Sequence, residues 1–172
     1  MTFVSASDGW VLGTAPCAVQ PCTSIVRTTD GGASWVGIPA PPVPLAANGP
    51  AGLSPGLSYL RFASPLDGFA FGSELWATYD GGAAWQQVLL PGTIGDLETA
   101  AGVVYAAVIA GNGAVTIYQS LAAGGAWIPV PGLPAEVPDQ GYVAPASVGR
   151  ITLHGTAAAV CHDVSPAIPS PS

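Results

Sequence analysis

One short element, Asp-Gly-Gly-x-x-Trp, recurs along this chain and constrains its fold more than any other feature. Residues 28–35 read Thr-Thr-Asp-Gly-Gly-Ala-Ser-Trp, and residues 78–85 read Thr-Tyr-Asp-Gly-Gly-Ala-Ala-Trp. A degenerate third copy covers residues 120–127, with Ala122 in place of the Asp. The final Trp residues of the three copies are 50 and 42 residues apart. Such a period is typical of architectures that repeat one supersecondary unit.

The segments around the element recur in the same order. An Asp-Gly-aromatic sequence precedes the first two copies at residues 8–10 and 67–69, and residues 101–106 are a weaker counterpart before the third. Downstream of each Trp, a short stretch ends in proline. Three features in a constant order indicate that one unit is repeated.

Each unit predicts four short antiparallel strands. The segments are rich in Val, Ile and aromatic residues and are bounded by Gly, Asp, Pro or Ser, as strands in meanders are. No segment has the apolar spacing of an amphipathic helix. We therefore predict an all-β chain whose units are blades of a β-propeller. The expected blades cover about residues 3–38, 58–88 and 94–130, with an incomplete blade at about 144–163 and a Pro/Ser tail at 164–172.

The repeated element is assigned to folding rather than to catalysis. An Asp at the start of a turn accepts hydrogen bonds from backbone N–H groups that follow it, and paired glycines supply positive φ angles. A carboxylate that several donors hold in its ionised form is a poor general acid or base, so we expect no catalytic residue here. The predicted structural residues are Thr28, Asp30, Gly32 and Trp35 in the first copy, Thr78, Asp80, Gly82 and Trp85 in the second, and Ser120, Gly124 and Trp127 in the third.

The element also carries a family resemblance. The pattern Ser/Thr-x-Asp-x-Gly-x-x-Trp resembles the Asp-box, or bacterial neuraminidase repeat, of sialidases, sortilin-type receptors and related propellers. The longer unit, Asp-Gly-Trp-x-x-Gly followed by Arg-Thr-Thr-Asp-Gly-Gly-x-x-Trp, is similar to the photosystem II assembly factor-like propellers. The resemblance covers about residues 3–130. It implies the fold, and it implies little about function because propellers host unrelated activities.

The cysteines leave two interpretations open. Cys17 and Cys22 fall in the loop between the second and third strands of the first unit, where a small disulfide would fit an exported protein. Free thiols in a cytosolic protein are the alternative. A zinc site is disfavoured because only Cys161, His154 and His162 could add soft ligands. We expect no metal, no cofactor and an extracytoplasmic location, secreted or in the cell envelope, although the chain shows no signal peptide of its own.

Composition narrows the choice of partner. The chain has 3 Lys and Arg residues against 10 Asp and Glu, which gives a formal net charge of −7. Nucleic acids and anionic membrane surfaces both require clustered cations, so neither is an expected partner. The longest apolar run, residues 100–110, is much shorter than the about 20 residues of a membrane helix, so we expect no membrane insertion.

The predicted function is a non-catalytic interaction or scaffold module that binds a protein or glycan partner. The alternative is a sialidase-like glycoside hydrolase whose catalytic residues lie mostly outside this chain. Such an enzyme needs an arginine cluster, and Arg27, Arg61 and Arg150 occupy unrelated positions within their units. The photosystem-type family also has an arginine-rich binding surface. We therefore carry over only its fold and its repeat.

Three blades and part of a fourth do not close a ring, because propellers typically have about 4 to 8 blades. An open arc exposes sheet edges and apolar faces. We therefore expect either a fragment of a longer propeller, completed by further blades, or self-association. The Pro-rich stretch at residues 39–55 should connect the first two blades. Such loops can carry binding function, but an exposed spacer is the preferred interpretation.

Overall fold

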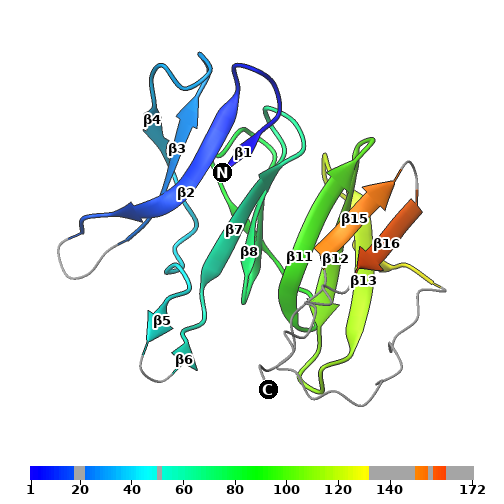
Figure 1. Ribbon diagram of the computed structural model, residues 1–172. Coiled ribbons are helices and arrows are strands. Elements are labelled where there is room, and N and C mark those ends of the chain that lie inside the picture. The colour runs from blue at the N-terminus through cyan, green and yellow to red at the C-terminus, as the bar shows by residue number, and fades with distance from the viewer. Residues whose placement is uncertain (18–21, 50–51, 132–149, 155–156, 162–172) are drawn as a thin grey trace, which may run out of the picture.

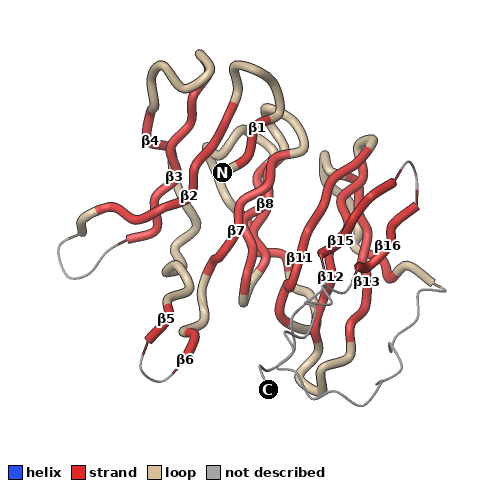
Figure 2. Tube along the Cα trace, in the orientation of Figure 1, coloured by secondary structure: helices blue, strands red, loops and turns tan. Residues whose placement is uncertain are grey.

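The structure is a computed structural model that describes residues 1–17, 22–49, 52–131, 150–154 and 157–161. All regular secondary structure in these ranges is β-strand, as Figure 2 shows. The expected incomplete blade at 144–163 is described only in part, and the tail at 164–172 lies outside the described residues.

Three four-stranded antiparallel sheets follow one another along the chain, and each is a meander of sequential strands. Sheet 1 consists of β1 (Thr2–Phe3), β2 (Gly9–Ala15), β3 (Cys22–Thr28) and β4 (Val36–Ile38). Sheet 2 consists of β7 (Leu57–Phe62), β8 (Gly68–Gly72), β9 (Leu75–Thr78) and β10 (Gln86–Val88). Sheet 3 consists of β11 (Thr93–Ala100), β12 (Val103–Ile109), β13 (Val115–Leu121) and β14 (Ile128–Pro129). Two small hairpins pair β5 (Asn48–Gly49) with β6 (Gly52–Leu53) and β15 (Arg150–His154) with β16 (Ala157–Cys161).

The first strands of successive sheets lie side by side. β1 contacts β7, β7 contacts β11, and β11 contacts β15 (Figure 1). The remaining strands of each sheet follow outward in sequence order. This is the arrangement of propeller blades around an axis, so the predicted fold class is confirmed.

The apolar core lies between neighbouring sheets. Trp10 and Ile25 of sheet 1 pack with Leu57, Leu60, Phe62 and Ala70 of sheet 2. The ring of Trp10 is fully buried and stacks on Phe62, with centroids 3.9 Å apart and planes 6° apart. A second cluster joins β8 and β9 to β11 and β12. Because sheet 2 is covered on both faces, β8 is buried at every position.

Residues 40–46 of the Pro-rich segment pack on the rest of the chain, so the prediction of an exposed spacer is wrong for this part, whereas Ser54 and Pro55 are exposed. Ala40, Val43 and Leu45 pack against the core between sheets 1 and 2. The Ala46 N–H donates to the Leu57 carbonyl at 2.8 Å, and the Leu57 N–H donates to the Pro44 carbonyl at 2.9 Å. Proline and glycine indicate irregular backbone, but irregular backbone can still be held by long-range contacts, and composition does not reveal these.

Replacing Trp10 by Ala should lower the free energy of unfolding by about 3 to 5 kcal/mol, because it removes a fully buried aromatic ring from the contact between two sheets. The matched control is Leu89→Ala, at a largely exposed position, which should change the free energy by less than about 0.5 kcal/mol. Urea denaturation followed by circular dichroism measures both values. Equal losses in the two variants would contradict a core placed between the sheets.

Candidate functional site

The first copy of the repeated element forms a hydrogen-bonded turn between β3 and β4. The Thr28 hydroxyl donates to Asp30 Oδ1 at 2.7 Å and accepts the Gly32 N–H at 2.9 Å. Asp30 Oδ1 also accepts the Ser34 N–H at 2.9 Å, and Oδ2 accepts the Ser34 hydroxyl at 2.6 Å. The Asp side chain thus bonds forward to the residue that precedes the Trp.

The second copy, between β9 and β10, repeats this geometry. The Thr78 hydroxyl donates to Asp80 Oδ1 at 2.7 Å and accepts the Gly82 N–H at 2.9 Å. Asp80 Oδ1 accepts the Ala84 N–H at 2.9 Å. Thr78 is buried, so its hydroxyl depends on partners inside the protein. The two turns therefore have one construction at equivalent positions.

The paired glycines allow the turn to dock on a neighbouring loop. Gly31 and Gly32 have φ angles of 72° and 94°, and Gly81 and Gly82 have 76° and 94°, a region that favours glycine. The Gly31 N–H donates to a carbonyl in the β1–β2 loop at 3.0 Å, and the Gly81 N–H donates to one in the β7–β8 loop at 2.8 Å. Each turn is thus fastened to the loop between the first two strands of its own sheet.

That receiving loop contains a second repeated motif, which the sequence reasoning missed. The Ser5 hydroxyl accepts the Asp8 N–H at 2.8 Å and donates to the Asp8 carboxylate at 2.9 Å. The Ser64 hydroxyl does the same with Asp67, at 3.0 and 2.7 Å. The signal was available, because a Ser stands three residues before the Asp-Gly pair in both units.

The third copy keeps the place of the turn but not its chemistry. Ala122 cannot accept hydrogen bonds through its side chain, and the buried Ser120 hydroxyl makes no hydrogen bond within the described part of the chain. Gly124 has a φ of 103°, so one glycine still takes the left-handed conformation. The Ala122 N–H donates to the Gly102 carbonyl at 2.8 Å, so the docking of the turn survives without the carboxylate.

The hydrogen bonds of the intact copies lower the pKa of both carboxyls. The Ser34 hydroxyl, followed by the Ser34 N–H and the Thr28 hydroxyl, lowers the pKa of Asp30 from 3.8 to about 2. The Ala84 N–H, followed by the Thr78 hydroxyl, lowers the pKa of Asp80. A general acid needs a pKa near the working pH. These two carboxylates are therefore suited to fixing turns and unsuited to proton transfer.

Trp85 and Trp127 join each sheet to the one before it. The Trp85 indole N–H donates at 2.9 Å to the carbonyl of Pro39, which follows the last strand of sheet 1, while the Trp85 ring meets Phe62 of its own sheet edge-on at 6.3 Å. The Trp127 ring of the third copy meets Phe69 of sheet 2 edge-on at 6.3 Å. The Trp of the element is thus a contact between sheets as well as a part of the turn.

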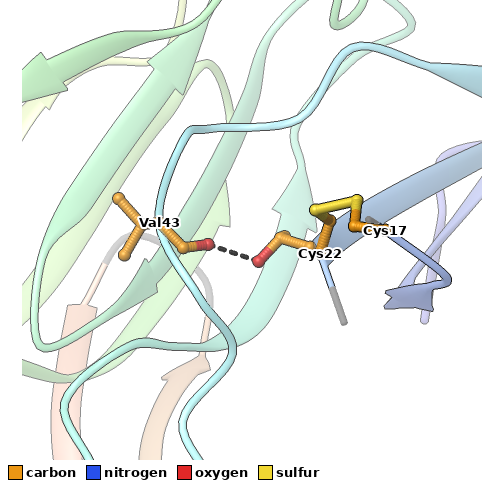
Figure 3. The surroundings of a disulfide bond; sticks show 4 residues. Cys17, Cys22 and Val43 are labelled. Carbon is orange, nitrogen blue, oxygen red and sulfur yellow. Dashed lines mark hydrogen bonds between the residues drawn. A yellow bond between two sulfur atoms is a disulfide. The ribbon is translucent and has the colours of Figure 1, made fainter. Parts of the chain in front are cut away.

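Cys17 and Cys22 are joined by a disulfide with a Cα–Cα distance of 5.7 Å (Figure 3). The bond closes the loop between β2 and β3. The neighbouring Thr23 hydroxyl donates to the Val43 carbonyl, so the base of this loop is also tied to the packed segment that follows sheet 1.

Two arginines make separate ion pairs. Arg27 Nη2 lies 3.4 Å from Asp8 Oδ1, and its guanidinium lies 5.2 Å from the Trp10 ring centroid. Arg61 of β7 pairs with Glu98 of β11. The two arginines lie on different sheets and have different partners, so they do not form a cluster.

An exposed aromatic side chain accompanies the second ion pair. Tyr59 lies two residues before Arg61 on β7, so both side chains project from the same face of the strand. Tyr59 stacks on Phe71 at 5.3 Å, yet 57% of the residue is exposed. We name Tyr59, Arg61 and Glu98 the inner-strand surface.

No group of three or more His, Cys, Asp or Glu side chains in the described ranges could hold a metal ion. The same part of the chain contains no helix long and apolar enough to cross a membrane.

Three meander sheets with adjoining first strands place this chain in the β-propeller class. No protein-family model matches the chain, and no curated protein matches it. Among solved structures it is similar to one described as "YCF48 bound to D1 peptide", with a TM-score of 0.43 and 21% sequence identity. The similarity covers 74% of this chain and 37% of that chain. A likeness this distant carries no argument about function.

Thr78→Val should lower the free energy of unfolding by about 1 to 3 kcal/mol, because a buried hydroxyl that both donates and accepts is lost. Ser120→Ala is the matched variant at the degenerate copy and should be close to neutral, since its hydroxyl has no partner to lose. Urea denaturation at neutral pH compares the two variants. A loss at Ser120 as large as that at Thr78 would contradict the difference between the copies.

The turn carboxylates should make stability depend on acid pH. Their folded-state pKa values lie below the unfolded value of 3.8, with Asp30 at about 2. Their contribution should therefore be complete above about pH 4 and should disappear as the pH falls toward 2. Thermal unfolding from pH 7 to pH 2 measures the loss, which should be smaller in Asp30→Asn than in the parent chain. Identical pH profiles for Asp30→Asn and the parent chain would contradict the prediction, because they would show that the turn does not stabilise the ionised Asp30 carboxylate.

Proposed function

We propose that this chain is a non-catalytic β-propeller module that binds a protein partner through the inner-strand surface. The observation that carries the proposal is the exposure of Tyr59 beside an ion pair that bridges two sheets. Aromatic residues and arginine are enriched in the centres of protein interfaces and among their energetic hot spots. A first strand beside the propeller axis also places this surface on rigid backbone.

The inner-strand surface has the chemistry to receive an extended polypeptide. The Tyr59 ring rests against Phe71, so it presents a flat apolar area that is already positioned. Arg61 supplies hydrogen-bond donors and Glu98 supplies acceptors, and a peptide backbone can use both. Because the pair is neutral overall, we expect recognition of a mixed apolar and polar segment rather than a strongly charged one.

Two observations support a role without catalysis. The conspicuous repeated carboxylates, Asp30 and Asp80, are occupied by hydrogen bonds from their own turns. Arg27 and Arg61 each have a separate carboxylate partner, whereas binding of a sialic acid carboxylate needs converging arginines. A sialidase-like activity therefore gains no support from these residues.

We further propose that the repeat is of the Asp-box type and that the protein works outside the cytoplasm. The reciprocal Thr–Asp bonding and the capping Trp support the first proposal. The disulfide between Cys17 and Cys22 supports the second, because disulfides persist mainly in oxidising compartments.

The location is tested by alkylating the protein directly as it is released from cells, with and without reductant, followed by mass spectrometry. Cys17 and Cys22 should resist alkylation until the reductant is added. Modification of both residues without reductant would indicate free thiols and would contradict the extracytoplasmic proposal.

Binding is tested by selecting a displayed peptide library on the immobilised chain and by probing a glycan array in parallel. Tyr59→Ala should weaken the selected peptides at least tenfold, since truncation of an aromatic hot spot costs about 2 kcal/mol or more. Tyr59→Phe should retain most of the affinity, and the exposed Leu89→Ala is the control. Peptide binding that ignores Tyr59, or Tyr59-dependent binding of glycans alone, would contradict the proposal.

A further inference from the structure

The contact between sheets 1 and 2 is built around an aromatic pair. Phe62 and Trp85 of sheet 2 meet edge-on, with centroids 6.3 Å apart and planes at 86°. Trp10 of sheet 1 stacks on Phe62, and the Trp85 indole N–H donates to the Pro39 carbonyl, which follows the last strand of sheet 1. We call Phe62–Trp85 the receiving pair and Trp10 the inserted ring.

Sheet 1 has a receiving pair of the same geometry. Phe3 and Trp35 meet edge-on, with centroids 6.4 Å apart and planes at 84°. Each Phe lies over the glycine that it faces on the second strand, because a Cβ at Gly9 would lie 2.4 Å from the Phe3 ring and one at Gly68 would lie 2.5 Å from the Phe62 ring. The two pairs are therefore equivalent in register as well as in shape.

The pairs differ in what covers them. In sheet 2, Phe62 is only 3% exposed. In sheet 1, by contrast, Phe3 is 43% exposed and Trp35 is 38% exposed. Grouped exposed apolar side chains of this kind mark interaction sites.

We propose that the Phe3–Trp35 face docks a further four-stranded sheet of the same repeat. That sheet presents an aromatic ring after a glycine on its second strand, as Gly9 and Trp10 do, and a backbone carbonyl after its fourth strand, as Pro39 does. The argument is the continuity of one interface: the chain already shows how an identical receiving pair is filled. This inference is independent of the inner-strand surface.

A second copy of this chain matches the face less well than a further sheet does. Trp10 is fully buried against sheet 2, and Phe69, its counterpart in sheet 2, is fully buried against sheet 3. Tyr105, the counterpart in sheet 3, is half-buried against Ala107 and Ile117 of its own sheet and follows Val104 instead of a glycine. An additional sheet with a Gly-aromatic pair like Gly9 and Trp10 is therefore the occupant that we favour.

The test supplies such a sheet by placing a duplicate of residues 1–60 directly before Thr2 of the full chain. This junction follows the natural register, since Thr2 and Phe3 correspond to Arg61 and Phe62. The duplicate carries Trp35→Phe, so that it adds no second Trp35 indole signal to that of the original chain. Hydrogen exchange of its indole N–H, followed by nuclear magnetic resonance, should slow at least tenfold relative to the chain without the duplicate.

Two variants of the duplicate make the result specific. Trp10→Ala in the duplicate should return the exchange of the Trp35 indole N–H to its original rate, because the inserted ring is gone. Trp10→Phe should keep the protection, as a Phe fills this role in sheet 2. A duplicate that folds by circular dichroism while the exchange stays unchanged would overturn the proposal. So would a 172-residue chain that sediments as a dimer and becomes monomeric on Trp35→Ala, since the occupant would then be a second copy.

Discussion

Contact between an aromatic ring of one sheet and an aromatic ring of the next is the interaction on which the rest of this structure depends. A sheet whose edge strands are as short as β1 and β4 has no interior of its own, so its apolar side chains are buried only when another sheet covers them. Trp10 on Phe62 and Phe69 on Trp127 provide that cover at successive contacts. The stability of each sheet is therefore shared with its neighbours, and sheet 2, which lies between two four-stranded sheets, contains the one strand, β8, that is buried at every described position.

The repeated turn makes these contacts reproducible. Thr and Asp close the turn, the paired glycines dock it on the loop between the first two strands, and the Trp that follows is held where the neighbouring sheet arrives. Residues that serve this purpose recur from unit to unit. Our proposal accordingly places recognition in residues that do not recur, Tyr59, Arg61 and Glu98. The repeat thus accounts for the fold without specifying the partner.

The sequence allowed the turn residues to be anticipated because their bonds are local. Thr78, Asp80 and Gly82 bond within four residues of one another, so the motif contains its own geometry. The Ser5–Asp8 motif was equally local and was overlooked, although its spacing recurs at Ser64 and Asp67. The packing of the segment after sheet 1 was predicted wrongly for a different reason. Its prolines indicate irregular backbone, and only the position of sheet 2 shows that Val43 and Leu45 are covered.

By itself, the sequence determined the repeated unit, its antiparallel strands and the position of each turn, because these depend on residues a few positions apart. The tertiary structure decided which side chains are covered and which remain available. The Arg61–Glu98 pair joins residues 37 positions apart, and its existence depends on how two sheets meet. The same holds for the two receiving pairs, which are alike in sequence and geometry. Phe62 of one pair is buried and Phe3 of the other is exposed, because the burial of a side chain depends on whether another sheet packs against it.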